Sequence, residues 1–178
     1  MEQVMALSVG DLFSRLASRS QATPKPGVSE AEIAAVQANL GCVFPSPLVE
    51  WFRLCNGWEI QNNQAESLGW FLSISTHLEE PTLSSIMAGA WWPRKSLIPI
   101  ASDLWGNSIC IDTAIAPGQG NQVRYMESTS GDLEVDMASD FHHFLLFMTY
   151  VVRRNSEDLF PDARWRKKHD PAFRRMSG

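Results

Sequence analysis

The amino-acid sequence predicts one α+β domain, in which N-terminal helices and a C-terminal helix pack on a mostly antiparallel sheet. Three observations lead to this fold class. Apolar residues at helical spacing occupy the first third of the chain, short runs rich in strand-forming residues follow, and a last helical stretch comes after them. Such segregation is typical of α+β proteins, whereas α/β proteins alternate helices and strands. The 178 residues, of which 44% are hydrophobic, suit a single domain with a buried core.

Three helices are expected in the first third of the chain. In the first, at residues 9–18, apolar residues recur every three or four positions. The second follows a capping box formed by Ser29 and Glu32, and Gly41 suits its end because glycine accepts a left-handed backbone. The third begins at Ser46, with a proline in its first turn. We expect the second and third helices to form an antiparallel pair.

Strand-forming runs occupy the middle of the chain. Their composition and the turn residues between them predict strands at residues 68–75, 97–101, 107–113, 122–127 and 133–137. The third and fourth of these should form a hairpin, because the stretch between them is rich in glycine. Pro99 cannot donate a backbone hydrogen bond, so the second strand should be short or lie at an edge of the sheet. Residues 83–88 are a candidate short helix.

A last helix is expected after Ser139, which we assign as its N-cap. Its inward face comprises Phe141, Phe144, Leu145, Met148 and Val152. We therefore expect the domain to span residues 1–152, and a basic C-terminal tail, partly ordered at most, to occupy residues 153–178.

The charge of the chain is unevenly distributed. The tail carries eight cations and four anions, so that its net charge of +4 leaves −9 on the body of a chain whose total is −5. An acidic body favours cationic partners and repels nucleic acid. The tail is either a solvated extension or a helix packed on the acidic body, or else an arm that binds RNA or an acidic partner.

No arrangement of side chains in the sequence predicts catalysis. His142 and His143 are adjacent on the expected helix and should face different directions, which does not suit a shared metal ion. The three cysteines have neither CxxC spacing nor an identifiable neighbouring base. The glycines of the hairpin turn precede a strand and not the helix that a phosphate loop needs. We expect no enzyme, and neither a cofactor nor a metal.

The expected location is the cytoplasm. The N-terminal residues do not form a basic stretch followed by an apolar one, as a secretory signal would. No run of about 20 apolar residues is present to span a membrane. Three cysteines without framework spacing are typical of free thiols in a reducing compartment.

Exposed indoles beside carboxylates are the candidate partner-binding residues, because tryptophan often anchors protein interfaces. The hypothetical contact set is Trp91, Trp92, Trp105, Glu79, Glu80 and Asp103. A second candidate is the alternating run Asp132, Glu134 and Asp136, which is either a solvated strand edge or an acidic contact strip.

Three blocks of sequence occur in an order known from one protein family. They comprise Ser29, Glu32, Ile33, Leu40, Gly41, Phe44, Pro45, Phe52, Asn56 and Gly57, then Leu97–Ala101 with Gly106–Asp112, and last Ser139–Leu145. Over residues 8–152 the pattern resembles the SUKH superfamily, the SMI/KNR-type domain. Asn107 departs from it, since an acidic residue is common at that place. Neither Trp91 and Trp92 nor the tail is an evident family feature.

The resemblance implies an α+β fold without established catalytic residues. Bacterial members of the family are similar to immunity proteins that bind a cognate toxin domain, often a nuclease, and fungal relatives regulate cell-wall synthesis. We therefore expect a non-catalytic domain that neutralises a cognate bacterial toxin by occluding its active site. An acidic body fits the cationic substrate groove of a nuclease. The alternative is a regulatory or scaffolding domain of the cell-wall-synthesis-regulator type.

Overall fold

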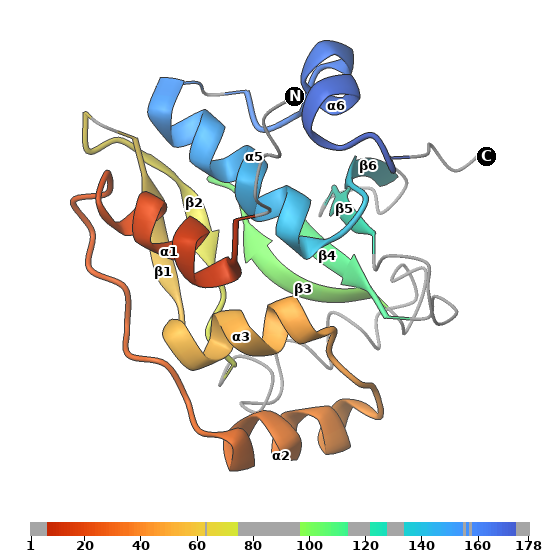
Figure 1. Cartoon of the computed structure of the whole chain (residues 1–178). Helices are drawn as coiled ribbons and strands as arrows, with labels where there is room; N and C mark the ends of the chain where they lie inside the picture. Colours follow the sequence, from red (N-terminus) through yellow and green to blue (C-terminus); the bar gives the residue numbers. More distant parts are fainter. Residues whose placement is uncertain are drawn as a thin grey trace.

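In the part of the chain that the structure describes, five helices and a six-stranded antiparallel sheet form the α+β fold that the sequence predicts (Figure 1). The computed structural model describes residues 7–62, 64–74, 97–113, 122–127, 134–154, 156 and 158–173. The helices are α1 (Val9–Ala17), α2 (Glu30–Leu40), α3 (Ser46–Leu54), α5 (Phe141–Arg154) and α6 (Ala163–His169). The strands are β1 (Trp58–Gln61), β2 (Ser67–Phe71), β3 (Leu97–Ser102), β4 (Ser108–Asp112), β5 (Val123–Met126) and β6 (Glu134–Ala138), and they neighbour one another in that order.

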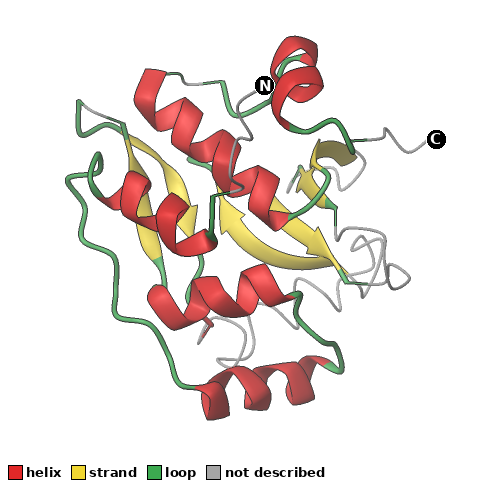
Figure 2. Ribbon diagram, in the orientation of Figure 1, coloured by secondary structure: helices red, strands yellow, loops and turns green. Residues whose placement is uncertain are grey.

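The core lies between the sheet and the helices α1, α3 and α5, which cover one of its faces (Figure 2). The indole of Trp51 on α3 is at its centre, with its ring centroid 4.4 Å from that of Phe71 on β2. Phe144 of α5 also packs against Phe71, with ring centroids 6.1 Å apart. Aromatic side chains thus pack α3, β2 and α5 together, although these elements are separated in the chain.

The predicted helix ends are confirmed by cap geometry. Ser29 and Glu32 form the expected capping box at α2, and Gly41 ends this helix with a left-handed φ of 65°. Ser8 and Asp11 form a second capping box at α1. Helices α2 and α3 run antiparallel below the sheet layer, as predicted (Figure 1).

Residues 97–101 were expected to form either a short strand or an edge strand; a strand is present, but the edge position is wrong, because β3 lies in the interior of the sheet between β2 and β4. A β-bulge between Pro99 and Ala101 accommodates the proline, whose missing N–H would otherwise interrupt the ladder to β4. The carbonyl of Ile100 accepts a hydrogen bond from the Leu72 N–H at 2.9 Å, which continues the sheet toward β2.

Strand β1 was not predicted, and β2 ends at Phe71, earlier than expected. β1 has four residues, with Trp58 and Ile60 buried and their neighbours half-buried. So short an alternation is a weak signal on its own. The candidate helix at residues 83–88 lies outside the described residues.

The described residues after Val152 pack against the domain. Helix α5 runs to Arg154, and α6 packs against it through Trp165, whose ring centroid lies 5.0 Å from that of Phe147. Beyond α6, the carboxylate of Asp170 accepts a hydrogen bond from the Ser139 N–H at 2.8 Å. The described part of the predicted tail thus contains a helix packed on the domain, and the binding role of the tail stays a prediction.

Candidate functional site

The β3–β4 turn, residues 103–107, is a rigid loop organised around the carboxylate of Asp103. One carboxylate oxygen accepts hydrogen bonds from the N–H groups of Trp105 and Asn107, both at 2.9 Å. The other accepts from the side-chain amide of Asn107 at 2.9 Å and from the hydroxyl of Tyr125 at 2.7 Å. Gly106 adopts a φ of 81°, which glycine tolerates without strain. Four donors on one carboxylate fix the conformation of this turn.

The Asp103 carboxylate is charged despite its burial. Burial alone would raise its pKa, but hydrogen bonds from Asn107, Tyr125 and the backbone outweigh this effect and hold the pKa below its ordinary value. For Tyr125, burial and the neighbouring Asp103 carboxylate raise the pKa of the phenol. The hydroxyl therefore remains a donor to Asp103 at neutral pH.

Large apolar side chains are exposed at the tip of this turn. The indole of Trp105 is 75% exposed and Leu104 is 48% exposed. Trp70, also exposed, lies on β2 opposite Ser102, the last residue before the turn. Exposed apolar side chains that gather at one place on a surface commonly mark a contact site for another protein. We name Leu104, Trp105 and Trp70 the indole patch.

The structure separates the residues of the predicted contact set. Trp105 is exposed, as an anchor must be, whereas Asp103 is 1% exposed and cannot contact a partner through its carboxylate. Its structural role was missed because its partner Tyr125 lies 22 positions further along the chain. Trp91, Trp92, Glu79 and Glu80 lie outside the described residues.

Of the alternating acidic run, the side chain of Asp136 is described, and it is largely buried. Asp136 lies 3.6 Å from the guanidinium of Arg124, and its side chain is 13% exposed. Asp112 lies 3.8 Å from the same guanidinium, and Arg124 itself is 2% exposed. These carboxylates therefore balance a buried cation on the face of the sheet away from the helices. Asp132 and the side chain of Glu134 lie outside the described residues.

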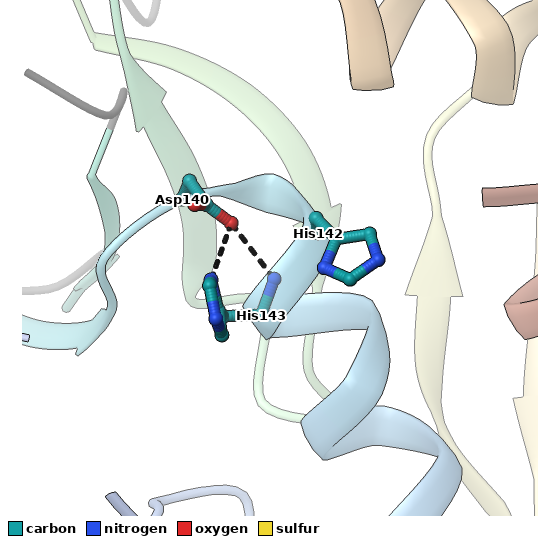
Figure 3. Close-up of side chains that lie close together, drawn as sticks. All are labelled: Asp140, His142 and His143. Atoms are coloured by element: carbon teal, nitrogen blue, oxygen red, sulfur yellow. Dashed lines mark hydrogen bonds and ion pairs between the residues drawn. The ribbon is translucent and has the colours of Figure 1, made fainter. Parts of the chain in front are cut away.

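A second cluster of ionisable groups lies where α5 begins. The N-cap is Asp140 and not Ser139, because the Asp140 carboxylate accepts from the His143 N–H at 2.8 Å. The same oxygen accepts from the ring Nδ1–H of His143 at 2.9 Å (Figure 3). Burial alone would raise the pKa of Asp140, but its contacts with His143 lower it, and the hydrogen bond to Asp140 raises the pKa of His143.

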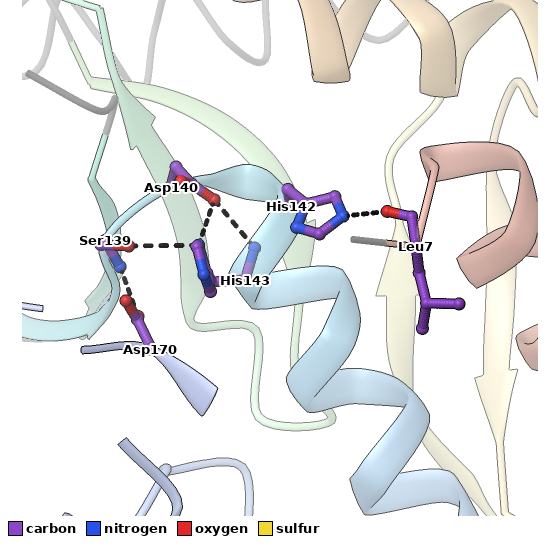
Figure 4. A network of polar contacts seen from close by, with 6 residues as sticks. All are labelled: Leu7, Ser139, Asp140, His142, His143 and Asp170. Atoms are coloured by element: carbon purple, nitrogen blue, oxygen red, sulfur yellow. Dashed lines mark hydrogen bonds and ion pairs between the residues drawn. The ribbon is translucent and has the colours of Figure 1, made fainter. Parts of the chain in front are cut away.

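This cluster joins three distant parts of the chain (Figure 4). The ring Nε2–H of His142 donates to the carbonyl of Leu7, just before α1. Ser139 contacts the His143 ring through its hydroxyl at 3.3 Å, and its N–H donates to Asp170 beyond α6. The arrangement serves to hold both ends of the described chain against the start of α5.

The adjacent histidines were expected to face apart, yet ligand atoms of Asp140, His142 and His143 lie within 4.8 Å of one another. The His143 ring points to Asp140, whereas the His142 ring points away from it to the Leu7 carbonyl, so the two rings face different directions as expected (Figure 4). A metal ion there would have to displace the proton from His143 Nδ1 and break its bond to Asp140. The geometry suits a shared hydrogen bond better than a metal centre.

Comparison with known protein families gives one result. Residues 27–146 match the sequence model of the SMI1 / KNR4 family (SUKH-1), which is the family that the sequence motifs indicate. The matched segment contains α2, α3, all six strands and the cluster at the start of α5. A search of curated proteins returned no match. None of the helices in the described part of the chain combines the length and apolar character needed to cross a membrane.

Proposed function

The chain belongs to the SMI1 / KNR4 family (SUKH-1), a family of immunity and regulatory domains, and we propose that it is an immunity protein that neutralises a cognate bacterial toxin. The proposed mode of action is occlusion: the chain binds the toxin domain and covers its active site, with no catalytic step of its own.

The observation that carries this proposal is the indole patch on its rigid turn. An interface anchor must be exposed before binding and must lose little conformational freedom on binding. Trp105 meets the first condition, and the four hydrogen bonds to the Asp103 carboxylate hold its backbone in place. Preorganisation of this kind lowers the entropic cost of association.

The charge of the body supports a cationic partner. The segment before residue 153 carries a net charge of −9. A nuclease presents a cationic groove to its substrate, and an acidic protein surface would be attracted to it over long range. Glu79, Glu80, Trp91 and Trp92 remain predicted members of the same contact surface.

The direct test is co-expression with the proteins encoded on either side of the gene. We expect the chain to relieve the toxicity of one of them and to co-purify with it. Trp105→Ala should weaken that complex by about 30-fold, which corresponds to about 2 kcal/mol, while thermal stability is retained because the indole is exposed.

The matched control is Val43→Ala, which also removes an exposed apolar side chain, since Val43 is 79% exposed between α2 and α3. It should leave the affinity unchanged. Equal affinity of the Trp105 variant and the wild type would contradict the indole patch as the anchor. Moderate binding to several partners that are not toxic would instead support the regulatory alternative.

A further inference from the structure

A basic groove of about 540 Å³ lies between α1, α5 and α6, and none of its lining residues belongs to the indole patch. Helix α5 lies between the other two helices (Figure 1). The lining includes six permanent cations from three segments of the chain, and Asp162 is its one carboxylate. The six cations are Arg15, Arg19, Arg153, Arg154, Arg164 and Lys168.

The six cations face a single carboxylate in the lining, and outside the lining Asp11 interacts electrostatically with Arg15. No carboxylate in the described part of the chain lies within ion-pair distance of the five arginines or of Lys168. Asp162, the carboxylate in the lining, is engaged as the N-cap of α6, where it accepts from the Trp165 N–H. Bringing six like charges to one hollow costs electrostatic energy, which a bound anion would offset.

The floor of the groove is partly aromatic. Trp165 and Tyr150 lie with ring centroids 6.4 Å apart, and the Arg154 guanidinium sits 4.9 Å from the Tyr150 ring. The His169 ring lies 5.3 Å from Trp165, and burial together with the neighbouring Lys168 lowers its pKa. The floor is therefore built of packed rings, while the cationic side chains of the rim are exposed to solvent.

We propose that this groove binds a small molecule that carries several phosphate groups. Arginine is the side chain best suited to phosphate, because its planar guanidinium presents paired N–H donors. The volume lies within the range of about 300–1,000 Å³ that is usual for small-molecule sites. A long polyanion such as RNA fits less well, because it would extend from the groove onto a body whose net charge is −9.

Inorganic tripolyphosphate is the first probe, added to the full chain and followed by calorimetry and by the fluorescence of the tryptophans. We expect saturable binding that weakens as salt is added and a rise in the melting temperature, since a ligand of the folded state stabilises it. Absence of saturable binding at millimolar tripolyphosphate would overturn the proposal.

Two substitutions on α6 separate the groove from general surface charge. Arg164→Glu changes a residue of the lining, whereas Lys167→Glu makes the same change of charge at an exposed residue outside the lining. We expect the first to weaken tripolyphosphate binding by about tenfold or more and the second by less than about threefold. Equal weakening by both variants would mean that the anion is held by net charge alone.

Arg15→Glu on α1 tests whether the groove acts as one site. It should weaken binding as Arg164→Glu does, although the two residues lie on different helices. A single-stranded RNA of about 20 nucleotides and an oligoglutamate peptide are the competing probes. Tighter, Arg164-dependent binding of either one than of tripolyphosphate would overturn the assignment to a small phosphorylated molecule.

Discussion

Asn107 is the residue on which the shape of the β3–β4 turn most directly depends. Its side-chain amide donates both to the Asp103 carboxylate and to the Tyr125 hydroxyl, and its backbone N–H donates to the same carboxylate. A carboxylate at this position could only accept, so it could not replace the amide. The acidic residue that is common here in the family would therefore need a different arrangement of the turn.

Asn107→Asp should destabilise the fold at neutral pH by about 2 kcal/mol, because it places a second carboxylate next to the buried one of Asp103 and removes a hydrogen-bond donor. Lowering the pH should restore part of this loss, since protonation of either carboxyl supplies a donor again. Urea unfolding of the variant and the wild type at several pH values measures both effects. Tyr125→Phe, which leaves the Asn107 amide in place, should cost less; a variant at position 107 as stable as the wild type would contradict this account.

The exposure of Trp105 could be predicted from the sequence, but the burial of Asp103 could not. A short turn between two strands lies at the surface, where no apolar interior is available to bury a tryptophan. Whether the neighbouring aspartate faces solvent depends on the register of β4 and β5, which places Tyr125 opposite Ile109 and within reach of the turn. Such register is determined by tertiary packing and leaves no local signal.

The Asp140–His143 pair makes the stability of the fold depend on pH. The folded-state pKa of His143 is raised above its ordinary value of 6.5, so its contribution is complete below that value and is lost as pH rises through the raised pKa. The folded-state pKa of Asp140 is lowered below 3.8, so its contribution is present above that value and is lost as pH falls through the lowered pKa. The pair stabilises most between pH 3.8 and 6.5.

His143→Gln should therefore lose more stability at about pH 5.5 than at about pH 8.5, relative to the wild type. Urea unfolding at the two pH values checks this. His169 is the contrasting control, because its pKa is lowered and its protonation disfavours the fold. His169→Gln should change stability with pH in the opposite direction, and the same sign for both variants would refute the assignment.

At the scale of the elements, α1, α2, α3 and α5 were predicted closely, whereas α6 was not predicted as a defined element and the sheet was predicted less closely. Helix ends are determined by local residues. In α2, Ser29 and Glu32 satisfy the backbone donors of the first turn, and Gly41 ends the helix. Strand positions depend on partners. Pro99 is found inside the sheet only because a bulge removes the need for its N–H, and a bulge is not visible in one strand's sequence.

Gly27 lies in the loop after α1 and packs against the end of α3, where there is no room for a side chain. A Cβ there would lie 1.9 Å from the Arg53 carbonyl oxygen. The loop is held at this place because the adjacent Val28 N–H donates to the Phe52 carbonyl at 2.9 Å. Gly27→Ala should destabilise the fold by about 3 kcal/mol, since backbone and not a flexible side chain must move. Thermal and urea unfolding measure the loss.

Gly10→Ala is the control for this prediction. It lies in α1, and the nearest atom to its Cβ would be the Ser8 Oγ at 3.6 Å, an ordinary contact. Alanine should be neutral there or stabilise by up to about 1 kcal/mol, because it favours the helix. Similar losses for the two variants would show that steric space at Gly27 is not the cause.

At the scale of the whole molecule, charge and apolar anchors are segregated. The chain totals −5, yet its basic residues gather where α1, α5 and α6 meet, and the indole patch lies on the β3–β4 turn. The sequence revealed the basic C-terminal segment but not the contribution of Arg15 and Arg19, which lie far from it in the chain. The packing of α1 on α5 brings Arg15 and Arg19 near Arg153 and Arg154, and the docking of α6 on α5 adds Arg164 and Lys168, so the complete groove depends on that docking.

Trp165 is the side chain that docks α6. It is 5% exposed and packs against Phe147 and Tyr150 of α5, so Trp165→Ala should remove most of the apolar contact between the two helices. In a fully connected core this substitution would cost about 3–5 kcal/mol. Because α6 lies near the C-terminal end of the fold and can detach while the sheet stays folded, the loss of stability is limited to the free energy that holds α6 in place.

The Ser139 amide reports this local opening, since its hydrogen is bonded to Asp170 beyond α6. In Trp165→Ala, hydrogen exchange at Ser139 should accelerate strongly, while amides in the interior strand β4 keep their protection. Lys167→Ala, an exposed change on the same helix, should leave both rates unaltered. Uniform acceleration across β4 and Ser139 would mean that α6 is an integral part of one cooperative unit. Unchanged exchange at Ser139 would mean that other contacts hold the segment, and the six cations of the basic groove would then stay together without the indole.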